Sequence, residues 1–266
     1  MAKIASFVLI LLGAPLALAA SEPAATQPAA AGAEQPAPVR WETWHAGNAV
    51  TDTASLQRGA RNFMNYCIGC HSLKYMRYQR MADDLQIPTS VLDANLVAPG
   101  SSNLDYIETS MPDADMVNWF GKSAPDLSLI ARSRSADYLY RFMKTFYSAP
   151  SRGTRSENLA YPSTAMPAVL SDLEGVKAAV YREVKGSSAG AATTESVFDH
   201  FETISPGNLT PEQFDGFVRD TVNFLDYVGD PAQVERRSIG LWVVLFLLLL
   251  SALALMLKKE YWKDVH

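Results

Sequence analysis

Two long apolar runs stand near the ends of the chain. The first extends from Ile4 to Leu18, follows a single lysine, and includes the small residues of an Ala17-Leu18-Ala19 cleavage pattern. Because this run is shorter than a membrane span and ends in small residues, it predicts a secretory signal peptide over residues 1–20. A permanent N-terminal anchor is the alternative interpretation.

The second apolar run, from Ile239 to Leu257, contains no charged residue. As a helix it is roughly 28 Å long, enough to cross a hydrocarbon core of about 30 Å. It predicts a transmembrane anchor over residues 238–258, with a buried helix of a soluble domain as the alternative. Because basic residues flank both ends, the predicted signal peptide decides the orientation and leaves residues 259–266 in the cytoplasm.

The chain between the two runs divides by composition. Residues 21–40 are rich in alanine and proline and nearly free of large apolar side chains, which predicts a flexible segment. Residues 41–237 have the length and the apolar content to form one exported domain with its own core.

Helical spacing of apolar residues recurs in that domain. One stretch leads into Cys67, a second surrounds Met143 after a loop, and a third begins at Thr210 with a capping sequence and ends near Gly229. Residues 171–205 give no prediction. We therefore expect a mainly α fold with long loops, in which short helices surround the functional centre and no sheet is needed.

Charge narrows the classes of partner. The formal net charge is −5, which does not suggest binding to nucleic acid or to anionic lipid headgroups and suits a basic protein partner. Ordinary solubility explains the same charge equally well. An acidic stretch forms a candidate docking patch, with a plain solvated loop as its alternative: Asp105, Glu108, Asp113 and Asp115.

The chain has two cysteines, Cys67 and Cys70, and His71 follows directly in a Cys-x-x-Cys-His sequence. In an exported protein the pair could form a disulfide or a thiol redox site, and zinc would need a fourth ligand that the other histidines are not spaced to provide. Cys-x-x-Cys-His is instead the attachment pattern of c-type haem. We therefore expect one covalent haem c, with two thioether bonds and His71 as an axial ligand.

The second axial ligand decides whether the haem serves electron transfer or leaves the iron open to an external ligand. A methionine in this position would fill the site and raise the haem potential. Met143 lies on an apolar helical face typical of core packing. Two methionines precede a proline in a stiff loop, Met111 and Met166. Acidic residues follow Met111, whereas small and apolar residues surround Met166, so we favour Met166 and keep Met111 as the alternative.

The order of motifs resembles the cytochrome c1 family. It comprises RGARNFMNYCIGCHSLKYMRY, APDLSLIARSR, DYLYRFM, AMPAVL and a terminal apolar anchor that ends KKEYWKDVH. The resemblance extends from about residue 41 to the end of the chain. It implies a c-type cytochrome domain whose haem is held by Cys67, Cys70 and His71, with Met166 as the distal iron ligand.

The resemblance also assigns secondary roles around the haem. It implies that Pro125 packs near the haem, that Arg134 binds a propionate, and that Tyr138 lines the pocket. The Ala-Met-Pro-Ala loop here lacks the family's double proline, and the spacing between Arg134 and Tyr138 is about two residues shorter than in some relatives.

The implied function is a one-electron relay in a quinol–cytochrome c reductase complex. Its partners would be cytochrome b, a Rieske iron–sulfur protein as donor, and a cytochrome c as acceptor, with the haem domain on the periplasmic side of a bacterial inner membrane. The chain would carry electrons without forming the quinol-oxidising site. The alternatives are a stand-alone anchored cytochrome that feeds a terminal oxidase, a haem enzyme or gas sensor with an open distal site, and a thiol redox protein.

Overall fold

A computed structural model describes residues 38–149, 156–188 and 191–263. The predicted signal peptide lies outside the described residues, as do residues 21–37 of the predicted flexible segment and residues 264–266 of the predicted cytoplasmic tail.

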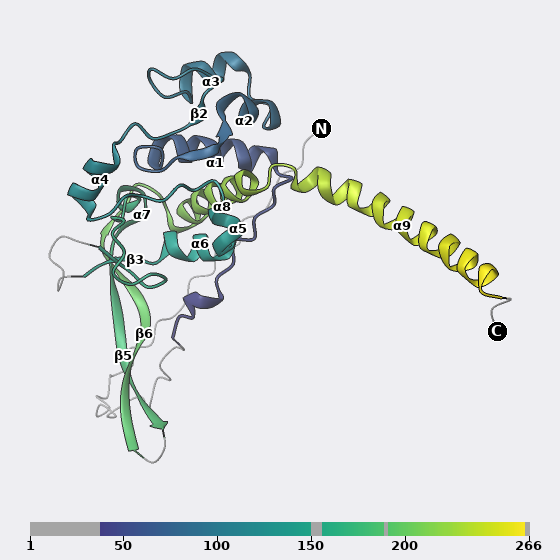
Figure 1. Cartoon of the computed structure of the whole chain (residues 1–266). Helices are drawn as coiled ribbons and strands as arrows, with labels where there is room; N and C mark the ends of the chain where they lie inside the picture. Colours follow the sequence, from purple (N-terminus) through teal and green to yellow (C-terminus); the bar gives the residue numbers. More distant parts are fainter. Residues whose placement is uncertain (1–37, 150–155, 189–190, 264–266) are drawn as a thin grey trace, which may run out of the picture. The chain divides into compact units, whose positions relative to one another are not determined.

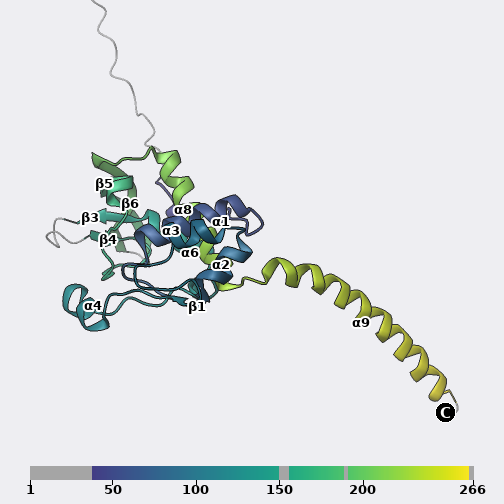
Figure 2. The ribbon, with the colours of Figure 1, turned by 90° about the horizontal axis from the view of Figure 1, so that it is seen from above.

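Two long helices, α1 (Thr53–Tyr66) and α8 (Pro211–Gly229), lie side by side at the centre of the domain (Figures 1 and 2). Their apolar faces form the core, in which the rings of Phe63 and Phe224 pack with centroids 5.9 Å apart. The capping prediction is confirmed, because the Thr210 side chain accepts from the Gln213 N–H while the Gln213 side chain accepts from the Thr210 N–H.

Shorter helices surround this pair and confirm the mainly α prediction. Helices α5 (Ile130–Arg134) and α6 (Ala136–Lys144) pack against α8, and the loop before them agrees with the sequence pattern. The remaining short helices lie elsewhere along the chain: η1 (Trp41–Thr43), α2 (Tyr78–Asp84), α3 (Thr89–Asn95), α4 (Asp113–Phe120) and α7 (Ser171–Glu174).

The expectation that the fold needs no sheet is wrong. One small sheet pairs β1 (Leu73–Arg77) with β2 (Tyr106–Ile107) in antiparallel orientation. A second has the order β4-β3-β5-β6, built from β3 (Phe146–Ser148), β4 (Ser156–Asn158), β5 (Gly175–Ser188) and β6 (Ala191–Pro206). Strands β5 and β6 form a long antiparallel hairpin that extends well beyond β3 (Figure 1).

The hairpin escaped prediction because its strands do not alternate cleanly. The pairing register shifts between Val176 and Lys177 and again between Val180 and Tyr181. Each shift reverses which side chains face a given side of the sheet, so the period-two signal is lost. Phe198 and Phe201 thus lie on one face, with ring centroids 4.8 Å apart. In a regular strand, side chains three positions apart would point to opposite faces.

Helix α9 (Gln233–Tyr261) confirms the predicted C-terminal helix and begins several residues before the apolar run. It is long and apolar enough to cross a membrane, and none of its residues is buried against the rest of the protein. Its composition and exposure fit a single-pass membrane protein.

Candidate haem site

The Cys-x-x-Cys-His residues occupy the turn that ends α1. Cys67 caps the helix, its N–H bonding to the carbonyl of Phe63, and the N–H groups of Cys70 and His71 bond to the carbonyl of Cys67 at 3.1 and 2.9 Å. All three residues are half-buried, and the two cysteines are free thiols rather than a disulfide. This turn brings both thiols and the imidazole together, which is the arrangement that two thioether bonds and an axial bond to one haem require.

A carbonyl group fixes the orientation of His71. The Nδ1 atom lies 2.8 Å from the carbonyl oxygen of Pro125, and because a carbonyl can only accept, Nδ1 carries the proton. The Nε2 atom is therefore the one with a free lone pair for a metal. Burial lowers the pKa of His71, against weaker opposing effects of the Pro125 carbonyl and Asp126, so the imidazole is neutral, as a ligand must be.

The Pro125–Ser128 loop is held in place by the strand that follows His71. The N–H of Leu127 bonds to the carbonyl of Ser72 at 2.9 Å, and the N–H of Lys74 bonds to the Asp126 carboxylate at 2.9 Å. The Pro125 ring is exposed, and the carbonyl of the same residue contacts His71. The sequence analysis missed that role.

The surroundings of both thiols disfavour the thiolate form. Burial raises the pKa of Cys67 to about 12, with a smaller contribution from Cys70, and burial also raises the pKa of Cys70. Reactive and metal-binding cysteines need the thiolate form, which low-pKa surroundings provide. In the part of the chain that the structure describes, no three His, Cys, Asp or Glu side chains come together to hold a metal ion.

Met166 lies half-buried in a loop that hydrogen bonds fasten to β4. The N–H of Ala168 bonds to the Ser156 hydroxyl at 3.0 Å, and the N–H of Ser163 bonds to the Glu157 carboxylate at 3.0 Å. Met166 lines a pocket of about 440 Å³ with mostly apolar neighbours: Phe120, Met143, Phe146, Leu170 and Val176. Such a lining suits the apolar face of a porphyrin.

Met111 lies in a different pocket, of about 220 Å³, which Cys70 also lines. Charged side chains dominate that pocket: Lys74, Glu108, Asp113 and Asp126. The structure thus groups Cys70 with Met111, whereas neither cysteine nor His71 lines the pocket of Met166. The apolar lining still favours Met166, because a charged pocket of half that volume is a poor place for a porphyrin ring.

Arg134 and Tyr138 lie close together in the structure, and neither lines the pocket of Met166 or that of Met111. Ser135, with a positive φ of 81°, separates α5 from α6, and its hydroxyl accepts from the N–H of Tyr138 at 3.2 Å. The guanidinium of Arg134 lies 5.5 Å from the centroid of the Tyr138 ring. Within the described residues Arg134 forms no ion pair, so its charge is available for an anionic group such as a propionate.

Two charged residues in the wall of the Met166 pocket, Glu174 and Lys177, had no place in the sequence analysis. They fall in the segment that gave no prediction. Their i, i+3 spacing across a glycine was the available signal, and only the tertiary structure shows that they are buried.

Comparison with known proteins gives consistent matches. A model described as the cytochrome C1 family matches residues 44–265. A cytochrome c1 from Allochromatium vinosum is 47% identical over 217 residues, covering 82% of this chain and 87% of that protein. A cytochrome c1 from Rhodobacter capsulatus is 25% identical over 246 residues, covering 79% of this chain and 83% of that protein.

A protein named ammonia monooxygenase gamma subunit, from Nitrosomonas europaea, is also similar. It is 37% identical over 215 residues, covering 81% of this chain and 85% of that protein.

Proposed function

This chain belongs to the cytochrome c1 family, and we propose that it is the haem c subunit of a bacterial quinol–cytochrome c reductase complex. Family membership makes it a haem c electron-transfer subunit. The observation that carries the proposal is the hydrogen bond from His71 to the Pro125 carbonyl, because it frees Nε2 in the turn that also holds both thiols.

The site residues then have distinct tasks. Cys67 and Cys70 would hold one haem c through thioether bonds, and His71 and Met166 would supply the ligands of its iron. Arg134, with its guanidinium over Tyr138, balances a propionate charge. When bound, haem c supplies reversible one-electron chemistry, and no acid or base is required of the protein.

The proposed electron route runs from a Rieske iron–sulfur protein through this chain to a basic cytochrome c. Four exposed acidic residues support the choice of acceptor: Asp105, Glu108, Asp113 and Asp115. Two of them, Glu108 and Asp113, line the same pocket as Cys70. Such a patch would steer a positively charged partner toward the site.

The proposed location is the bacterial inner membrane, with α9 as its single span beside cytochrome b. The predicted signal peptide places the haem domain in the periplasm and the residues after α9 in the cytoplasm. Exposure of the apolar residues along α9 supports an environment of lipid and partner helices.

Replacement of the distal ligand tests the site. In Met166→Leu we expect covalent haem to remain, the long-wavelength absorption band of methionine-bound ferric haem to disappear, and the reduction potential to fall strongly. Met111→Leu is the matched control and should change neither. The opposite pattern would transfer the ligand role to Met111.

Purification tests the complex. We expect detergent extracts to yield this chain together with a b-type haem protein and an iron–sulfur protein in fixed proportion. A chain that purifies alone, with an intact six-coordinate spectrum, would instead be the stand-alone anchored cytochrome. A five-coordinate spectrum would favour the open-site haem enzyme or gas sensor.

A further inference from the structure

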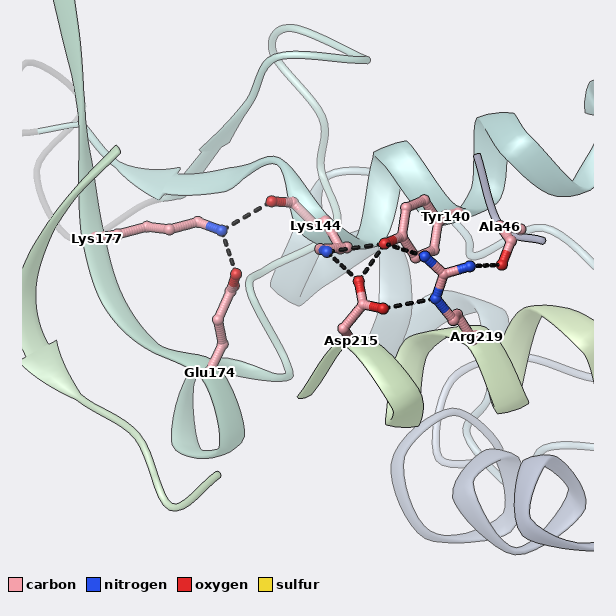
Figure 3. Close-up of polar contacts among 7 residues, drawn as sticks. All are labelled: Ala46, Tyr140, Lys144, Glu174, Lys177, Asp215 and Arg219. Atoms are coloured by element: carbon pink, nitrogen blue, oxygen red, sulfur yellow. Dashed lines mark hydrogen bonds and ion pairs between the residues drawn. The ribbon is translucent and has the colours of Figure 1, made fainter. Parts of the chain in front are cut away.

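Lys177 and Glu174 form a buried ion pair in the wall of the Met166 pocket. The Lys177 ammonium donates to the Glu174 carboxylate and, at 2.8 Å, to the backbone carbonyl of Lys144 (Figure 3). Only 11% of the Lys177 side chain and 19% of the Glu174 side chain are exposed. The ring of Phe201 covers the ammonium, with 4.3 Å between the nitrogen and the ring centroid.

The local fold holds this pair in place. Glu174 ends α7, and Gly175 then turns the chain into β5 with a positive φ of 96°. A side chain at Gly175 would collide with the backbone of β6, so the turn is closely packed. Lys177 therefore enters β5 at a fixed position, with its ammonium directed to Glu174 and away from solvent.

The next cation along, Lys144, has its own counterions. Its ammonium donates to the Asp215 carboxylate and to the Tyr140 hydroxyl, and Arg219 donates to Asp215 as well (Figure 3). The hydrogen bond from Lys177 to Lys144 goes to the backbone carbonyl of Lys144 and not to its side chain. Among the acidic and basic residues described in the structure, Lys177 and Glu174 are thus the two that line the Met166 pocket.

Stability does not explain such a pair. A buried ion pair often contributes no more to stability than apolar residues of similar size, because both charges lose their hydration. Burial in this pocket has a different consequence for any redox centre bound there. Charges in a low-dielectric surrounding act strongly on a neighbouring charge, and reduction of a ferric iron removes one positive charge.

We propose that Lys177 and Glu174 set the reduction potential of the haem held by Met166. The positive charge of Lys177 favours the reduced iron and raises the potential, whereas the negative charge of Glu174 favours the oxidised iron and lowers it. This inference rests on the proposed function, because it requires haem in the Met166 pocket.

Redox titration of the full-length, detergent-solubilised holoprotein tests the signs. In Lys177→Gln we expect a lower midpoint potential, in Glu174→Gln a higher one, and in the double variant a value between the two. Lys177→Arg keeps the charge and should keep a potential near that of the unchanged protein. The matched controls are Lys259→Gln, beyond the apolar run, and Glu183→Gln, exposed on β5; neither should shift the potential.

The absorption band of methionine-bound ferric haem separates this inference from the proposed function. If the band persists in all these variants and the two single substitutions shift the potential in the same direction, or not at all, the inference is wrong while the ligand assignment stands. If Met166→Leu leaves the band unchanged, the ligand assignment itself is wrong. Should Lys177→Gln fail to form holoprotein, Lys177→Met, with similar length and no polar head, replaces it in the titration.

Discussion

Asp215 is the residue on which the polar cluster of α6 and α8 converges. Its carboxylate accepts from the Lys144 ammonium, from the Tyr140 hydroxyl and, at 2.6 Å, from the Arg219 guanidinium (Figure 3). Burial alone would raise the pKa of Asp215, but these three hydrogen bonds outweigh it and lower that pKa to about 2. The ionised carboxylate is therefore the form that the folded protein favours.

This shift predicts how stability depends on pH. Because the folded-state pKa lies below the ordinary value of 3.8, the contribution of Asp215 is fully present above about pH 4 and is lost as the pH falls toward about 2. Asp215→Asn should thus lower the unfolding temperature at pH 7, with a difference from the unchanged protein that narrows as the pH is lowered through this window. Thermal unfolding at several pH values measures the difference. Glu202→Gln, exposed on β6, is the control, and a difference independent of pH would contradict the prediction.

The haem-binding residues differ in how far the sequence could predict them. Cys67, Cys70 and His71 are neighbours in sequence, so their spacing alone predicts a common turn. The Pro125 carbonyl that orients His71 is 54 positions away, and a backbone group has no residue type to mark its role. The resemblance pointed to this stretch, and the folded chain adds that the Pro125 carbonyl orients His71.

At the scale of elements, the close packing of α1 against α8 depends on Gly59. A Cβ atom at this position would lie 2.6 Å from the Cβ of Phe224 and would also meet the backbone carbonyl of Asp220. Backbone cannot move aside as the tip of a flexible side chain can, so the two helices would have to separate.

Gly59→Ala should therefore destabilise the protein although alanine is the better helix former. Overpacking costs typically about 1–3 kcal/mol, against a gain in helix propensity of about 1 kcal/mol. Gly216→Ala on α8 is the matched control, because its Cβ would meet no atom within 4 Å, and it should be neutral or slightly stabilising. Chemical denaturation of both variants measures the change in unfolding free energy, and equal effects would argue against the close contact.

The elements also show where pattern reading succeeds and fails. Helix α8 was predictable at both ends because its capping residues and its apolar face are local features of the sequence. The β5–β6 hairpin was not predictable, because two register shifts break the alternation that identifies a strand. The pocket wall formed by Glu174 and Lys177 depends on that hairpin, so it was missed for the same reason.

At the scale of the whole molecule, the core of the domain is complete without α9. The buried residues of the core cluster lie between Ala46 and Val228, and α9 has none. Asp230, just before α9, forms ion pairs with Arg236 of α9 and with Arg132 of α5. Removal of α9 takes away Arg236 but leaves Arg132, whose Nη1 lies 3.9 Å from Asp230 Oδ2. The domain boundaries drawn from the sequence stay predictions, but the core gives a physical reason to expect a separable anchor.

Ending the chain after Pro231 should release a water-soluble holoprotein. Removal of α9 takes away the exposed apolar surface that requires lipid or detergent, while every core residue and every proposed haem ligand remains. We expect the shortened protein in the soluble fraction after cell breakage, with the oxidised and reduced spectra of the full chain. A chain that ends after Tyr261 is the control and should stay in the membrane fraction. If the shorter chain sedimented with membranes, the domain would have a second membrane contact; if it lacked haem, α9 would be needed for assembly of the site.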